Sequence, residues 1–426
     1  MRGKRSLICA VAVLVALLCS GNVWAAGFQL FEENASGIGN AYAGSAAVAE
    51  NASTIFFNPA GMTKLQAREI SLGLTAVKPS IKFSNSGSTN PAAFNTPAGS
   101  TAPATGTEGG DAGGWNYIPN GYVSWGLAKD FYAGIGVSAP FGLATEYDSN
   151  WMGRYQAIKF KIETINVNPS LAYRVNEMIS LGFGVSWQKM KAEYVRQGHP
   201  TFGQVSLNAD DNAWGWNAGA LFQLAPATRL GVSYRSAVKH TLGGDLSGNA
   251  VLGLPQPASA DIKLPDMAIV SFMQGMGNSW ELLGDISWTG WSSVDKIDVM
   301  KTNTGALAQT LNADFKDTWR VALGANYRVS EAWKLKFGLA YDQTPVPDAE
   351  HRMVSLPDSD RTAVATGVQW KPTKTSALDF GVEYLFMKAT DINNNQDSPP
   401  TLARGLVKGD YSNNALILGA QYSLSF

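Results

Sequence analysis

Cysteine is absent from all but the start of this sequence. The two cysteines, Cys9 and Cys19, both lie within the first 25 residues. Those residues have the plan of a cleavable export signal, with a basic start, an apolar core from Leu7 to Leu18 and a predicted cleavage after Ala25. The predicted mature chain therefore has no thiol, which excludes disulfides, thiolate metal sites and cysteine nucleophiles.

Long hydrophobic runs and an excess of positive charge are missing as well. No run of about 18 apolar residues follows the predicted signal 1–25, so no transmembrane helix is expected. Without the three basic residues of the signal, 30 basic and 34 acidic residues remain, so nucleic acid is not an expected partner. Frequent aromatics and glycines with near-neutral hydropathy are typical of a transmembrane β-barrel, whose strands are apolar only on alternate residues.

Histidine is scarce, and no catalytic motif is present. His199, His240 and His351 lie far apart, in or beside predicted outer loops, without metal-ligand spacing, and they are expected to be solvated. The sequence has no Gly-x-Ser-x-Gly elbow, Walker-type loop or dinucleotide fingerprint. We therefore expect no enzyme, no cofactor and no metal site.

What the chain does contain is persistent alternation of apolar and polar residues from Arg68 to the C-terminus. Ile179, Leu181 and Phe183 face one way, for example, while the small residues between them face the other. Alternation with a period of two predicts β-strands, with the apolar face toward lipid and the other toward the lumen.

The connectors between these segments predict the topology. Six short turns alternate strictly with seven long connectors, as expected for an outer-membrane barrel with short periplasmic turns and long outer loops. Residues 67–426 are therefore predicted to form an all-β, antiparallel barrel of about 14 strands. The long connectors are Ser84–Gly114, Pro140–Met152, Arg196–Asp211, Gly243–Ser259, Met300–Asn312, Thr344–Ser359 and Ile392–Lys408.

Aromatic residues cluster at the predicted strand ends, where interfacial girdles form. The last strand also ends in an aromatic residue, Phe426, as outer-membrane barrels usually do. The alternative is a soluble β-sandwich that ends in phenylalanine by chance. The predicted girdle contains Trp187, Trp214, Trp216, Trp288, Trp291, Trp319, Tyr327, Trp333, Tyr341 and Trp370.

Residues 26–66 lack this alternation and are rich in Gly, Ala, Ser and Asn. A segment of this size ahead of a barrel fits inside its lumen as a plug, or hatch, built from short helices. The alternative is a loop-rich extension on the surface. The AGFQL start, the run Gly37–Gly44 and the triplet Asn58-Pro59-Ala60 resemble the hatch of the FadL-type outer-membrane transporters of long-chain fatty acids and other hydrophobic compounds.

The resemblance implies passive uptake of a hydrophobic small molecule across the outer membrane of a Gram-negative bacterium. It implies contact with outer-membrane lipids and lipopolysaccharide, and a monomeric state. The ligand could be a fatty acid, an aromatic hydrocarbon or another apolar compound. A diffusion porin for polar solutes and a structural or adhesive barrel remain alternatives, because lumen-facing charges such as Arg229 and Lys336 fit a pore or a plug.

The resemblance also implies site residues. Phe28 matches an aromatic residue that touches bound ligand, and Leu30 and Phe31 are weaker candidates. The third strand, Phe131–Pro140, matches one that kinks inward beside the triplet Asn58, Pro59 and Ala60, opening a lateral exit through the wall. Gly134 and Gly136 are the candidate lateral gate, since glycine weakens a strand and permits a bend. Alternatively, the two glycines make room for the plug and the exit is periplasmic.

Overall fold

The computed structural model describes residues 27–397 and 404–426. The predicted export signal, residues 1–25, lies outside this part of the chain. Among the described residues, no helix is long and apolar enough to cross a membrane.

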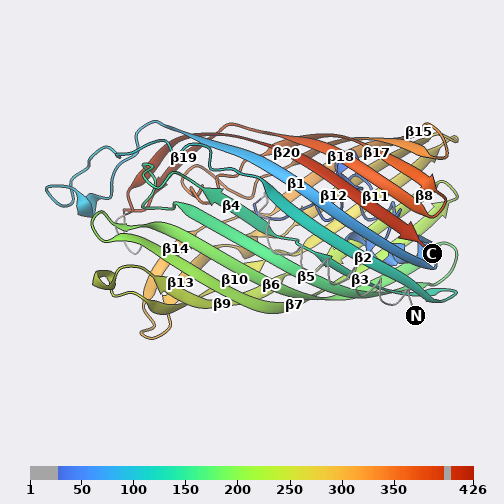
Figure 1. Cartoon of the computed structure of the whole chain (residues 1–426), viewed down its shortest axis with the longest axis horizontal. Helices are drawn as coiled ribbons and strands as arrows, with labels where there is room; N and C mark the ends of the chain where they lie inside the picture. The colour runs from blue at the N-terminus through green and yellow to red at the C-terminus, as the bar shows by residue number, and fades with distance from the viewer. Residues whose placement is uncertain (1–26, 398–403) are drawn as a thin grey trace.

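One antiparallel sheet closes on itself to form the barrel (Figure 1). The first strand, β1 (Arg68–Asn85), pairs with β2 on one side and with the last strand, β20 (Leu406–Ser425), on the other. The wall has fourteen strands, which confirms the predicted number. Closure leaves no unpaired sheet edge to face lipid.

Six of the fourteen wall strands are interrupted and consist of two segments each. In chain order the wall is β1, β2 (Asn116–Ala128), β3 (Phe131–Ser138) with β4 (Gly142–Glu146), β5 (Lys159–Arg174), β6 (Ile179–His199), β7 (Gly203–Ala225), β8 (Thr228–Arg235) with β9 (Val238–Ser247), β10 (Gln256–Leu264) with β11 (Met267–Met276), β12 (Trp280–Thr289) with β13 (Lys296–Lys301), β14 (Leu307–Asn312) with β15 (Thr318–Arg328), β16 (Trp333–Asp342), β17 (Arg361–Thr373), β18 (Ser376–Met387) with β19 (Thr390–Asn395), and β20.

The predicted inward and outward faces agree with the burial of the side chains. On β16, Phe337 and Leu339 are exposed on the outer face, whereas Lys336, next to Phe337 in the chain, is buried. The alternation arises because the outward face meets lipid and the inward face meets the contents of the lumen.

The prediction of a long connector at Arg196–Asp211 is wrong. Strands β6 and β7 instead continue as a paired hairpin whose turn is residues 200–202. The expected connector Met300–Asn312 is likewise mostly strand, in β13 and β14. These parts of the strands have polar side chains such as Lys189 and Asp210 on the sheet. The lipid-facing apolar pattern, on which the prediction depended, is therefore absent from them.

One tryptophan and one histidine also lie in places other than those expected. Trp291, predicted in the girdle, is fully buried at the short helix η5 (Trp291–Ser293), inside the barrel. His240, predicted in a solvated region, is buried on β9, with Nε2 3.0 Å from Gln188 Oε1 and Nδ1 3.1 Å from Asp211 Oδ2. His240 faces inward because β9 continues the wall into the expected loop, and Trp291 does so because the chain leaves the wall at η5 between β12 and β13.

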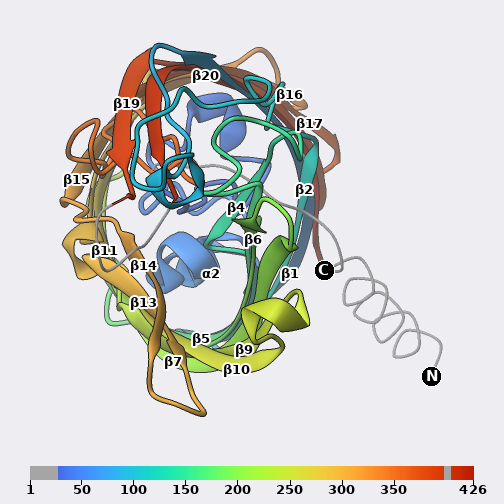
Figure 2. The same cartoon turned by 90° about the vertical axis from the view of Figure 1, so that its left-hand side faces the viewer.

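Residues 27–65 precede β1 and lie inside the barrel, and we call this segment the hatch (Figure 2). It contains the short helices η1 (Ile38–Asn40), α2 (Thr54–Phe57) and η2 (Pro59–Lys64). Two other short helices, η3 (Ala92–Phe94) and η4 (Ala250–Leu252), lie in connectors.

The buried apolar residues form two clusters, one above the other in the lumen. The inner cluster combines the hatch with inward side chains such as Val77 and Tyr122. The outer cluster lies toward the longer connectors and contains Phe28, Phe141 and Trp291. The two clusters meet at the N-terminal end of the hatch, where the candidate site lies.

Candidate functional site

The Asn58-Pro59-Ala60 triplet fastens the hatch to one side of the wall. Asn58 Nδ2 donates to the carbonyl oxygens of Ala46, at 2.8 Å, and Ala220, at 3.0 Å. Its Oδ1 accepts from Ala60 N at 3.1 Å and so caps η2. Gly182 and Gly219, which are cross-strand partners, provide the space that the triplet occupies. A Cβ on either glycine would lie 2.2 Å from a triplet atom. The triplet therefore fits a notch between two glycines on β6 and β7.

Arginines of the wall hold other hatch carbonyls. Arg229 Nη1 donates to Val48 O at 2.7 Å, Arg235 Nη2 to Phe56 O at 3.0 Å, and Arg320 Nη2 to Ala41 O at 2.7 Å. These lumen charges are therefore used to bind the plug rather than to line an open pore.

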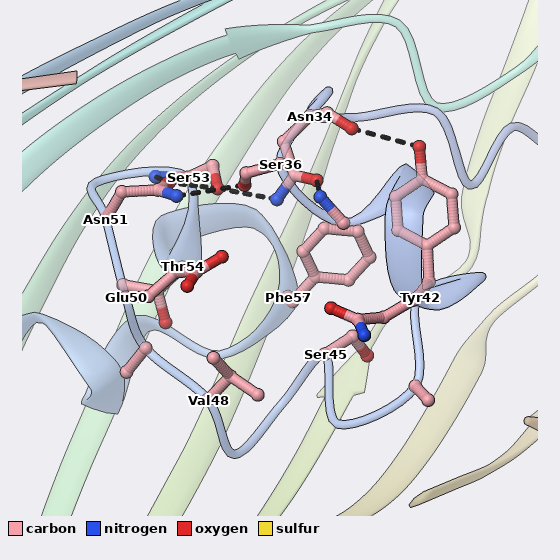
Figure 3. Close-up of a pocket in the computed structure, with 14 residues that line it drawn as sticks. Asn34, Ser36, Tyr42, Ser45, Val48, Glu50, Asn51, Ser53, Thr54 and Phe57 are labelled. Carbon is pink, nitrogen blue, oxygen red and sulfur yellow. Dashed lines mark hydrogen bonds between the residues drawn. The ribbon is translucent and has the colours of Figure 1, made fainter. Parts of the chain in front are cut away.

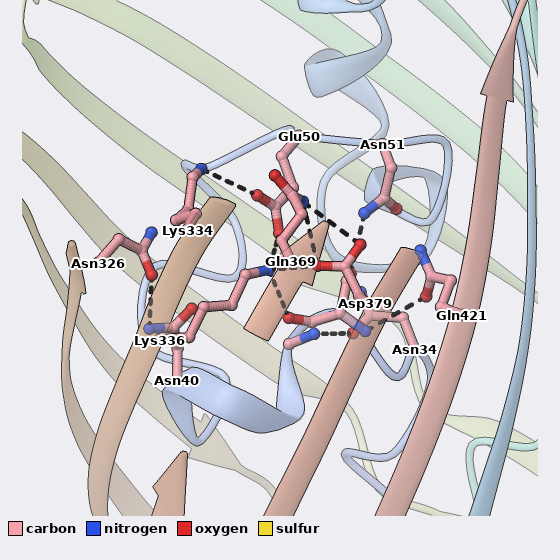
Figure 4. Close-up of polar contacts among 12 residues, drawn as sticks. Asn34, Asn40, Glu50, Asn51, Asn326, Lys334, Lys336, Gln369, Asp379 and Gln421 are labelled. Carbon is pink, nitrogen blue, oxygen red and sulfur yellow. Dashed lines mark hydrogen bonds and ion pairs between the residues drawn. The ribbon is translucent and has the colours of Figure 1, made fainter. Parts of the chain in front are cut away.

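An ion-pair network fastens the opposite side of the hatch (Figure 4). Buried Lys336 on β16 pairs with Glu50 of the hatch and with Asp379 on β18, the latter at 2.9 Å, and donates to Ser36 O at 2.9 Å. Lys334 lies 3.5 Å from Glu50. Burial raises the pKa of Glu50, but Lys336 and Lys334 outweigh it and lower that pKa to about 2. Glu50 is therefore ionised at ordinary pH, and we call these four charged residues the latch.

The interior of the hatch holds a polar cavity of about 410 Å³ (Figure 3). Its loops are joined across the cavity by Asn34 Nδ2 donating to Ser53 Oγ at 2.6 Å and by Asn51 Nδ2 donating to Ser36 Oγ at 2.9 Å. The hatch thus combines its share of the inner apolar cluster with loops that are joined by hydrogen bonds around this space.

The third wall strand breaks at Ala139–Phe141, between β3 and β4. On the β2 side, pairing ends at Gly121 and Val137, whereas β4 pairs with β5. Phe141 is clamped to β5, since its N donates to Thr164 Oγ1 at 3.0 Å and Thr164 Oγ1 donates to its carbonyl at 2.6 Å. The wall therefore has a break in its hydrogen bonding between β2 and β4, which we call the kink.

Gly134 and Gly136, the glycines expected to permit the bend, lie a few residues before this break. Both glycines are paired with β2 and β5 without interruption. A Cβ on Gly134 would lie 2.6 Å from atoms of the hatch residues Ile55 and Met62, and one on Gly136 would lie 2.7 Å from the ring of Tyr122. These contacts match the alternative in which the glycines make room for the plug. The third wall strand is interrupted at Pro140, which has no N–H to donate to the hydrogen bonds between strands.

Phe28 lies at the kink. Its carbonyl accepts from Gly142 N at 2.8 Å, and its ring lies 4.8 Å from the ring of Trp291 and 5.9 Å from that of Phe141. Gly27 N donates to buried Asp358 Oδ2 at 3.0 Å, which ties the segment to an outer connector. Phe28 therefore separates the outer apolar cluster from the break in the wall.

The side chains of Leu30 and Phe31 belong to the inner cluster with the rest of the hatch, although the Leu30 backbone also reaches the kink. Leu30 N donates to Pro140 O at 2.9 Å, and the Phe31 ring packs under the guanidinium of Arg320, 4.5 Å from its centroid. Of the three predicted ligand-contacting residues, only Phe28 is in the outer cluster.

A large apolar cavity occupies the outer lumen. It encloses about 620 Å³, part of it open to solvent, and its walls come from inward faces of β5, β6, β7, β9, β10, β13 and β14. Most of its lining side chains are apolar, including Phe160, Ile162, Met190, Leu207 and Leu311, which belong to the same cluster as Phe28. The cavity has the size and lining of a site for a hydrophobic small molecule.

One arginine, Arg196, lies where this cavity becomes polar, and a second, Arg404, lies near it. Arg196 lines it beside Gln309, with Nε donating to Gln309 Oε1 at 3.3 Å and Nη1 to Gln197 O at 3.2 Å. Burial and the positive charge of Arg196 lower the pKa of the nearby Arg404 to about 10. Both guanidinium groups bond to neutral groups in the described part of the chain. The sequence did not indicate this site, because Arg196 was placed in a loop.

Within the described residues, no group of histidine or acidic side chains has the arrangement of a metal site. The hatch, the kink and the outer cavity therefore make up the candidate site.

Comparisons with known proteins agree with this arrangement. A family model described as "Outer membrane protein transport protein (OMPP1/FadL/TodX)" matches residues 16–426. A long-chain fatty acid transport protein of Salmonella typhi is 30% identical over 419 residues, covering 90% of this chain and 92% of that protein.

Solved structures share the fold. A Pseudomonas aeruginosa FadL homologue superimposes with a TM-score of 0.84 at 24% identity, covering 94% of this chain and all of that one. The toluene transporter TodX of P. putida has a TM-score of 0.67 at 15% identity, covering 92% of this chain and 98% of that one.

Proposed function

The chain belongs to the OMPP1/FadL/TodX family of outer-membrane transport proteins, and on that premise we propose that it admits long-chain fatty acids by passive diffusion. The fold and family place it in the outer membrane of a Gram-negative bacterium as a channel for hydrophobic compounds. The choice of a fatty acid, the passive mechanism and the route below are our proposal.

The observation that carries the proposal is a partly buried arginine, Arg196, at the rim of an apolar cavity. A long alkyl chain would bury its surface against side chains such as Ile162 and Leu207, gaining about 25 cal/mol per Å². A carboxylate would supply, through charge-assisted hydrogen bonds, the anionic partner that Arg196 does not have among the described residues. An aromatic hydrocarbon would leave that charge uncompensated, which favours the fatty acid.

In the proposed route, the ligand leaves the outer cavity past Phe28 and exits sideways through the kink. Two observations support this: Phe28 contacts the outer cluster and bonds to Gly142 at the break, and hydrogen bonding between β2 and β4 is missing there. Lateral exit would put the ligand directly among outer-membrane lipids, below the lipopolysaccharide. We further propose that the protein works as a monomer, because the cavity, kink and hatch all come from one chain.

The test compares ligands with the same tail and different heads. Oleate should bind the purified protein about tenfold more tightly than oleyl alcohol, because a charged hydrogen bond contributes about 1.5–3 kcal/mol. Arg196→Met should remove that preference and leave the binding of the alcohol unchanged. Titration with tryptophan fluorescence measures both affinities.

Arg328→Met is the matched control, because Arg328 is an exposed arginine at the other end of the barrel. It should leave the preference intact. Equal affinities of the wild type for oleate and the alcohol would refute the choice of a fatty acid.

A further inference from the structure

Two buried N–H donors near the polar end of the outer cavity have no partner among the described residues. Arg404, two residues before β20, is 3% exposed. Its Nη1 donates to Gln396 Oε1 in a long bond of 3.4 Å, and its Nε is unpartnered. Gln309 Nε2, on the cavity wall, is buried and unpartnered too. Because burying an unpaired polar group is costly, these donors mark a place where another acceptor binds.

The contacts of Gln156 place Arg404 beside the cavity. Gln156 Nε2 donates to Gly405 O, next to Arg404, at 3.1 Å. Gln156 O accepts from the hydroxyl of Tyr194, whose side chain lines the cavity. Tyr194 and Arg196 are two residues apart on β6, so their side chains share the inward face of this strand. Arg404 and Arg196 therefore lie at the same end of the cavity.

The two guanidinium groups have no anion to balance them. All 34 acidic residues lie in the described part of the chain, since neither residues 1–26 nor residues 398–403 contain Asp or Glu. None of these carboxylates pairs with Arg196 or Arg404, whose side chains bond to amide and carbonyl oxygens. Neighbouring like charges repel each other, and a buried charge without a counterion is costly. A head group with two negative charges would compensate both arginines, whereas a carboxylate compensates one.

We propose that Arg404 and the Gln309 amide complete, with Arg196, a site for a phosphate monoester head group, so that the protein also admits long-chain alkyl phosphates. The inference rests on the proposed function, because the alkyl tail would occupy the same apolar cavity. A phosphate monoester carries about −1.5 to −2 charges at neutral pH and has three strong acceptor oxygens. Two guanidinium groups and one amide N–H supply donors for these oxygens.

The experiment compares three head groups on one tail. Oleyl phosphate, oleyl sulfate and oleate are titrated into the purified protein at pH 8, and binding is followed by tryptophan fluorescence. We expect oleyl phosphate to bind about tenfold more tightly than oleate, because a second charged hydrogen bond forms. Oleyl sulfate has the tetrahedral shape of the phosphate but a single charge, so its affinity should be close to that of oleate.

Arg404→Met should lower the affinity for oleyl phosphate about tenfold and that for oleate much less. Arg404→Lys keeps the positive charge and should retain most of the advantage of the phosphate. Arg154→Met is the matched control, because Arg154 is a partly exposed arginine of the same outer region, bonded to Trp151 O at 3.0 Å, and does not line the cavity. It should leave the ratio of the affinities unchanged. Heat-modifiable gel mobility shows that each variant is folded.

Equal affinities of the wild type for oleyl phosphate and oleate would overturn the inference, and this comparison needs no variant. Equal losses for both ligands in Arg404→Met would overturn it as well, because the two arginines would then share one carboxylate. An equal advantage for oleyl sulfate would show that the site selects shape and not charge. Failure of the proposed function is distinguishable, since the wild type would then bind oleate no more tightly than oleyl alcohol.

Discussion

The hatch contacts the barrel differently on its two flanks. Toward β16 and β18 it is held by the latch, in which Lys336 has two carboxylates and a carbonyl as partners. Toward β2–β5 no ion pair holds it among the described residues, and its contacts are hydrogen bonds such as Leu30 N to Pro140 O and Arg174 to Thr63 O. Regions held by fewer strong contacts open at lower free energy than the rest of a fold. A passage can therefore open beside the kink while the plug stays attached on its far side.

The largest effect should come from breaking the latch. Lys336→Met leaves Asp379 without its cation and leaves Glu50 with Lys334 alone. Removing one partner of a buried ion pair typically costs about 3–5 kcal/mol, so the hatch should detach on this flank. We expect steady ion conductance in planar bilayers, where the wild type shows little. Lys239→Met, which removes a well-exposed cation on β9, is the control and should not conduct. A closed Lys336→Met channel would show that the latch flank is not what retains the plug.

A smaller effect is expected from the triplet. Asn58→Ala removes the cap of η2 and the two bonds to Ala46 and Ala220. Loss of a cap costs about 1 kcal/mol, so the hatch should loosen locally without leaving the lumen. Entry of a small polar dye into cells should rise modestly, with heat-modifiable gel mobility unchanged. Dye entry as large as that of Lys336→Met would contradict the prediction that the triplet holds the hatch less strongly than the latch does.

The smallest effect should come from pH on the latch. The pKa of Glu50 is lowered to about 2, so its contribution to stability is fully present above its unfolded pKa, near 4.5, and is lost as the pH falls through about 2. Wild-type conductance should therefore stay unchanged between pH 5 and pH 9. Opening of the channel within this range, measured in the same bilayers, would contradict the assignment of Glu50 to a permanent contact.

The sequence predicted the barrel well because lipid imposes a period of two on the wall, as at Phe337 and Leu339. It predicted the hatch because small residues without alternation fit inside a lumen. Arg196 was missed because its part of β6 lies beyond the apolar pattern, and the latch was missed because Glu50 and Lys336 are 286 residues apart. The break at Pro140 had a signal, the missing N–H, but the nearby glycines drew the prediction away from it.

The seam between β1 and β20 has a consequence for how the molecule assembles. Its pairs, from Glu69 with Ser425 to Asn85 with Gly409, join residues more than 300 positions apart, so the barrel closes only after the whole chain is available. The hatch touches both sides of this seam, through Ala52 N to Ser71 Oγ at 3.2 Å and Ala35 N to Gln421 Oε1 at 3.2 Å. The hatch that blocks the finished channel therefore also joins the first and last strands of the wall and stabilises the closed cylinder.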